Sequence, residues 1–187
     1  DWSSDVCSSD LAAVEKANRE TGRNCLYFPN VTGSGRGIYK KAFFAQEAGA
    51  GGFLICPGLA GFEAIHCLAG DERLHLPVMS HPSLLGSFIV NAKSGIAPSV
   101  LFGQLPRLSG ADISIYPTYG GSFAITENDC RQIAKESALP WGGLKPIFPS
   151  AAGRIHLDSV GELFEVYQNE MVIVVGGEIR SEEHTSE

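Results

Sequence analysis

Short apolar segments alternate with helical patterns over most of the chain, and this alternation limits the fold more than any other feature. The segments that look like strands are 25–28, 52–56, 76–79, 113–116, 145–148 and 171–175. Most are apolar throughout instead of alternating with polar residues, which is typical of parallel strands buried on both faces. The sequence therefore favours a parallel sheet covered by helices.

Helical patterns fill the intervals between these segments, at 11–20, 38–48, 62–69, 99–108, 127–138 and 157–167. Thr126 and Asp129 form a capping-box pattern at the start of the fifth helix. Pro106 lies inside the fourth and is expected to kink it or end it early. Strands that alternate with helices in this way indicate βαβ units with right-handed crossovers.

Two architectures fit such units, an open doubly wound sheet and a closed barrel. No Gly-x-Gly-x-x-Gly motif follows the first predicted strand, which weakens a dinucleotide-binding fold. Polar residues and glycines instead follow nearly every predicted strand: Asn30, His81, the loop 119–121, Gly153, and Gly176 with Gly177. A ring of such strand ends is typical of barrel enzymes. We predict an α/β chain that forms an incomplete (β/α)8 TIM barrel.

The last two predicted strands both run into glycines, which suggests an anion site. Gly153 follows one strand, and Gly176 and Gly177 follow the other. Glycines let backbone N–H groups approach phosphate oxygens, and the loops after the last two barrel strands commonly hold a substrate phosphate. Arg154 could add a charge-assisted hydrogen bond or block this cradle. The alternative is that these are simple turn glycines.

Three other places are candidates for binding or catalysis. His81 follows an apolar strand, and a histidine there could carry a proton beside a sugar carbonyl or serve as a structural side chain. Asn30 could contact substrate or simply start an Asx-turn. The loop 118–122, which contains Gly121 and Ser122, could close over a substrate or be a plain loop.

The two ends of the chain do not continue the internal pattern. Segments 1–10 and 180–187 read as in-frame translations of a sequencing adapter, so we expect one natural domain over about 11–179 and a truncated chain. These ends carry five of the seven net negative charges, so the acidity implies no basic partner. No basic stripe indicates nucleic acid, and no apolar run reaches the ~20 residues of a membrane span. Cysteines without metal-type spacing favour free thiols in the cytoplasm.

Four stretches are similar to the C-terminal barrel domain of the RuBisCO large-subunit superfamily. They are 20–32, 105–112, 149–154 and 174–177, with 41–45 and 79–82 between them in the expected places. The resemblance covers essentially 11–179 and implies that the chain spans about strands 3 to 8 of the barrel. It also implies that Asn30 lies beside magnesium and substrate oxygens.

Three departures separate the chain from the carboxylating members of that superfamily. Pro82 stands where those enzymes have a phosphate-gripping arginine, and Leu85 replaces a second histidine. Ser122 occupies the place of the lysine that helps position carbon dioxide. The resemblance therefore implies a RuBisCO-like protein. The superfamily's Mg2+ ligands, a lysine and two acids on the second strand, are expected upstream of this chain.

The function implied is action on a phosphorylated ketose through a Mg2+-stabilised enediolate, as an enolase, isomerase or decarboxylase. In that reading His81 is catalytic, and the phosphate or substrate contacts Asn30, Gly121, Ser122, Gly153, Arg154, Gly176 and Gly177. The full-length protein is expected to be a homodimer, and this chain alone to be inactive. Three alternatives stay open: a non-catalytic binding relative, an unrelated phosphate-binding barrel lyase or epimerase, and a true carboxylase.

Overall fold

A computed structural model describes residues 5–91, 93–120, 124–153, 155, 158 and 160–175. Its helices are α1 (Asp5–Thr21), α2 (Arg36–Glu47), α3 (Pro57–Ala60), α4 (Phe62–Ala69), η1 (Leu85–Phe88), η2 (Val100–Gln104), α5 (Leu105–Leu108), α6 (Glu127–Ala138) and α7 (Val160–Tyr167). Its strands are β1 (Phe53–Ile55), β2 (Val78–Ser80), β3 (Ile113–Pro117), β4 (Phe148–Ala152) and β5 (Val172–Val174).

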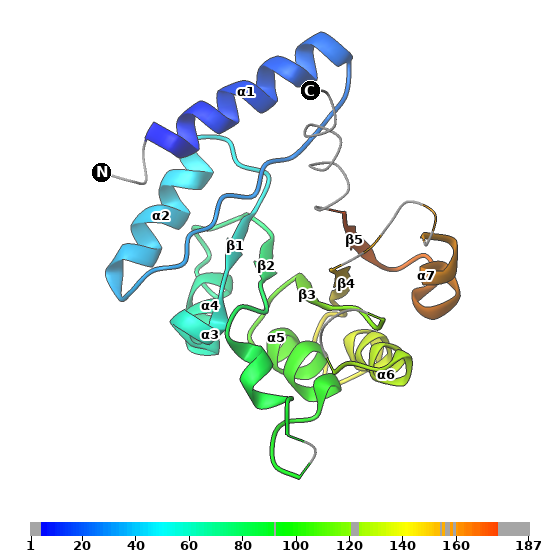
Figure 1. Ribbon diagram of the computed structural model, residues 1–187. Helices are drawn as coiled ribbons and strands as arrows, with labels where there is room; N and C mark the ends of the chain where they lie inside the picture. Colours follow the sequence, from blue (N-terminus) through cyan, green and yellow to red (C-terminus); the bar gives the residue numbers. More distant parts are fainter. Residues whose placement is uncertain are drawn as a thin grey trace, which may run out of the picture.

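The five strands form one parallel sheet in the order β1-β2-β3-β4-β5. The helices follow an arc along the outer side of this sheet, from α2 past α4, α5 and α6 to α7 (Figure 1). A doubly wound sheet reverses its strand order at a switch point, whereas these strands never reverse. The prediction of an α/β fold with part of a TIM barrel is confirmed.

The strand predicted at 25–28 does not form, although the segment runs beside β1. Gly51 N donates to Tyr27 O and Leu54 N to Pro29 O, and Asn30 makes an isolated parallel bridge with Leu54. Pro29 has no N–H to donate, so a regular ladder is interrupted there. The segment is therefore an extended edge next to the sheet.

β4 and the helix around Pro106 also differ from the sequence prediction. β4 begins at Phe148, not Lys145, and its centre consists of the buried residues Pro149, Ser150 and Ala151. Pro106 does not end its helix: a π-helical turn, in which Leu105 N donates to Val100 O, precedes it and runs directly into α5. The capping box at Thr126 and Asp129 is confirmed, with both reciprocal hydrogen bonds present.

Two apolar cores lie between the sheet and its helices. One joins Phe53, Ile55 and Val78 to α2 and α4, and the other joins Tyr116 and Ala151 to η2, α6 and α7. Because successive strand residues point to opposite faces, the intervening residues point to the inner side of the arc. The cores thus fix which side chains face the inside of the partial barrel.

Candidate functional site

The inner face of the sheet is defined by strand register. Leu54 pairs with Met79, and Met79 with Ile113, so these three side chains share that face. One row nearer the carboxyl ends of the strands, Ile115 pairs with Ser150 and Ser150 with Val172. Parallel strands place all their carboxyl ends at one edge, so residues that follow them meet at one rim.

His81 lies at this rim, directly after β2, and its N–H donates to Ile55 O at 2.9 Å. By alternation its side chain shares the inner face with Met79. Partial burial of the imidazole lowers the pKa of His81, because it disfavours the charged ring. A neutral histidine at this position is suited to hydrogen-bond a substrate oxygen.

Asn30 lies on the same face, opposite Leu54, at the end of the extended segment. Its Oδ1 accepts from Thr32 N at 2.9 Å, so the Asx-turn that the sequence allowed is present. The Asn30 side chain is exposed. Asn30 can keep this turn and still contact a substrate through its amide NH2 group.

Gly153 follows β4 and has a φ of 88°, in the region that side chains rarely adopt. It is exposed, and a Cβ built there meets no atom within 4 Å. The glycine is therefore required by backbone conformation and leaves open space at the rim. Arg154, Gly176 and Gly177, predicted to complete the phosphate cradle, lie outside the described residues, as do Gly121 and Ser122.

Sequence reasoning missed two residues that the fold brings to the inner face and its rim. Thr32 Oγ1 accepts from Cys56 N at 2.9 Å and joins the first loop to the end of β1. Ser150 Oγ is buried on the inner face without a hydrogen-bond partner in the described structure. The only signal for Ser150 was its place in the alternation of strand residues, and that alternation can be assigned to a face only once the register is known.

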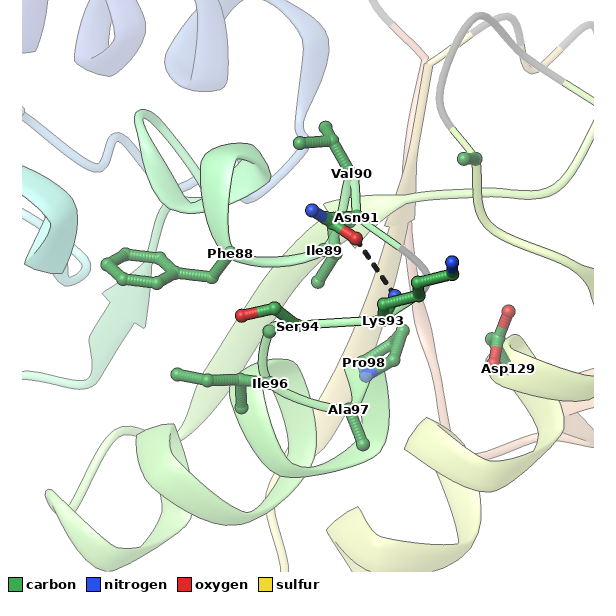
Figure 2. A pocket seen from close by; sticks show the side chains of 12 residues that line it. Phe88, Ile89, Val90, Asn91, Lys93, Ser94, Ile96, Ala97, Pro98 and Asp129 are labelled. Atoms are coloured by element: carbon green, nitrogen blue, oxygen red, sulfur yellow. Dashed lines mark hydrogen bonds between the residues drawn. The ribbon is translucent and has the colours of Figure 1, made fainter.

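A second hollow, of about 470 Å3, is lined by a different set of residues. Its walls are Phe88 at the end of η1, the loop between η1 and η2 with Asn91 and Lys93, and Asp129 of α6 (Figure 2). Lys93 N donates to Asn91 Oδ1 at 2.9 Å across the turn (Figure 2). None of the site residues predicted from the sequence is among the described residues that line it.

The described residues do not supply a metal site. No three histidine, cysteine, aspartate or glutamate side chains among them gather closely enough to hold an ion. The donor set at the rim, one neutral imidazole and one amide, does not suit Mg2+, which prefers carboxylate oxygens. Within the same residues, no helix is both long and apolar enough to cross a membrane.

Comparison with known proteins agrees with this geometry. The family described as ribulose bisphosphate carboxylase large chain, catalytic domain, matches residues 3–182. A 2,3-diketo-5-methylthiopentyl-1-phosphate enolase of Exiguobacterium sibiricum is 35% identical over 84% of this chain and 40% of its own length. A 5-methylthioribulose-1-phosphate isomerase of Rhodospirillum rubrum is 33% identical over 90% of this chain and 43% of its own length.

Among solved structures, a rubisco-like protein (MtnW) from Alicyclobacillus acidocaldarius superposes with a TM-score of 0.87 at 28% identity. The superposition covers 95% of this chain and 45% of that one. The chain thus spans less than half the length of these relatives.

Proposed function

The chain belongs to the family of the ribulose bisphosphate carboxylase large chain, catalytic domain, and from this premise we propose that the whole protein is a RuBisCO-like enzyme that enolises or isomerises a phosphorylated ketose. Relatives named as a diketo-methylthiopentyl-phosphate enolase and a methylthioribulose-phosphate isomerase support this class. Family membership removes the alternative of an unrelated barrel lyase or epimerase.

The main support for the proposal is that His81 and Gly153 lie at the same rim. Both residues directly follow parallel strands of one sheet that never reverses order. In the proposed complex, backbone N–H groups of the loop after β4 bind the phosphate. His81 then contacts the oxygen or carbon centre that changes during enolisation. Contributions from Arg154, Gly176, Gly177, Gly121 and Ser122 are part of the same proposal.

Two positions count against carboxylation of a bisphosphate. Pro82 offers no charge for a second phosphate beside His81. Leu85, in place of a second histidine, is 3% exposed and belongs to the apolar core. The proposed substrate therefore carries one phosphate, bound at the β4 end of the rim.

We propose that Mg2+ binds residues outside this chain, because the described residues do not fit the ion. We also propose, from membership of the family, that the full-length protein is a cytoplasmic homodimer. Size-exclusion chromatography with light scattering on the full-length protein tests the dimer.

We propose further that 1–10 and 180–187 derive from adapter sequence, which amplification of the gene from genomic DNA tests.

The activity test uses the restored full-length protein with Mg2+. Incubation with 2,3-diketo-5-methylthiopentyl-1-phosphate and with 5-methylthioribulose-1-phosphate in D2O, followed by NMR, should show C–H exchange or conversion of one of them. His81→Gln should lower that rate by about 100-fold or more. Absence of exchange with either compound, despite binding, would favour the non-catalytic alternative.

A further inference from the structure

The turn that follows β2 holds the imidazole of His81 from one side. Ser83 Oγ lies 2.8 Å from His81 Nδ1, and Ser83 N donates to the same nitrogen at 3.3 Å. A backbone N–H can only donate, so Nδ1 must be the unprotonated nitrogen of the ring. The hydrogen-bond network thereby assigns the proton of the neutral ring to Nε2.

The same turn has an unusual backbone. Leu84 adopts φ 66° and ψ −10°, a left-handed conformation that costs energy for a leucine, and its side chain is 62% exposed. Leu85 N donates to Pro82 O at 3.0 Å and closes the turn. Strained conformations of this kind persist where the surrounding structure fixes them, and they concentrate at functional sites.

Gly58 of α3 provides the surface against which this turn packs. A Cβ at Gly58 would lie 2.2 Å from Ser83 O and 3.0 Å from Leu84 Cβ. Ser83 O is a backbone atom and Leu84 Cβ is attached directly to the backbone, so neither can move aside unless the turn itself moves. The missing side chain of Gly58 therefore lets Ser83 sit where it reaches His81.

We infer that Ser83 is a positioning residue which fixes His81 as a neutral imidazole with its proton on Nε2. Its catalytic meaning depends on the proposed function. In that setting His81 donates a hydrogen bond from Nε2 to a substrate oxygen. Gly58, which packs against the turn, and the strained Leu84 within it maintain this arrangement.

The test reads the tautomer directly, without substrate. In the full-length protein labelled with 15N-histidine, the His81 ring signals are identified by their loss in His81→Gln, and proton–nitrogen correlations show which nitrogen carries hydrogen. We expect the Nε2–H form to predominate at neutral pH. Ser83→Ala should lower the ratio of Nε2–H to Nδ1–H forms about fivefold, the effect of losing one ordinary hydrogen bond. Ser83→Thr should restore the ratio.

A second variant approaches the same contact from α3. Gly58→Ala should displace Ser83 and shift the tautomer ratio in the same direction. Gly86→Ala is the matched control, because a Cβ at Gly86 meets no atom within 4 Å, and it should leave the ratio unchanged. A proton found mainly on Nδ1, or a ratio that Ser83→Ala does not change, would overturn the inference. Because no substrate is present, this result is independent of the activity assay.

Discussion

Arg107 shows how one residue organises the edge of the sheet at the amino ends of the strands, opposite the proposed site. It is 3% exposed, and its guanidinium donates to the carbonyl oxygens of Glu136, Leu139, Leu144 and Lys145. The first two belong to the end of α6, where helix carbonyls lack intrahelical partners and a positive charge is favourable. Arg107 thus joins α5, the end of α6 and the approach to β4.

We predict that Arg107→Met lowers the free energy of unfolding by at least about 2 kcal/mol, because several carbonyls lose their donor together. Urea unfolding followed by circular dichroism measures this. Arg131→Met is the control, since Arg131 is exposed and pairs with Glu127 on the helix surface, a contact worth at most about 1 kcal/mol. Equal losses in the two variants would show that Arg107 has no special role.

The lowered pKa of His81 predicts a pH dependence of stability. The unfolded chain binds a proton on this histidine near pH 6.5, whereas the folded chain binds it only at lower pH. Stability should therefore decrease as the pH falls below about 6.5. Unfolding at pH 7 and pH 5 should show a smaller decrease in His81→Gln than in the parent. Identical pH profiles would mean that the folded ring titrates like the unfolded one.

At the scale of elements, Gly51 and Gly52 set how closely the edge segment approaches β1. A Cβ at Gly52 would lie 2.1 Å from the Phe28 ring, so any side chain there displaces the ring. We predict that Gly52→Ala costs roughly 1–3 kcal/mol of unfolding free energy. Gly37→Ala, at a position with open space, serves as control and should cost little. A thermal unfolding midpoint unchanged by Gly52→Ala would contradict the packing described here.

The elements that sequence predicted well are those with strong local signals. The start of α6 is fixed by its own capping box, and β5 is a compact apolar run. The bounds of β4 were missed because tertiary burial, not a run of large apolar residues, selects Ser150 and Ala151 for the strand. The π-helical turn before Pro106 was likewise unpredictable, since it depends on packing of η2 against β3 and α6.

The candidate site was predicted less completely than the fold. Sequence indicated His81, Asn30 and Gly153 because each follows an apolar run, and the structure places all three directly after the sheet strands or the edge segment. Ser83 was missed because its contact with His81 depends on the strained Leu84 and on the space left by Gly58. Those features arise only when α3 packs against the next loop.

For the whole molecule, strand order explains why residues far apart in sequence lie at one edge of the sheet. Each strand pairs in parallel with the next, the two cores fill the space under the helices, and the inner face remains lined by alternate residues. His81 and Gly153 are therefore brought to one rim by the sheet itself. We propose that this rim binds the phosphorylated substrate of the whole protein.

A crystal structure of the full-length protein with 5-methylthioribulose-1-phosphate bound tests that claim most directly. We predict that the phosphate contacts backbone N–H groups of the loop that follows β4, with the sugar chain extending toward His81 Nε2. A phosphate bound elsewhere, such as in the hollow beside Lys93 and Asp129, with the rim left free of ligand, would contradict the account.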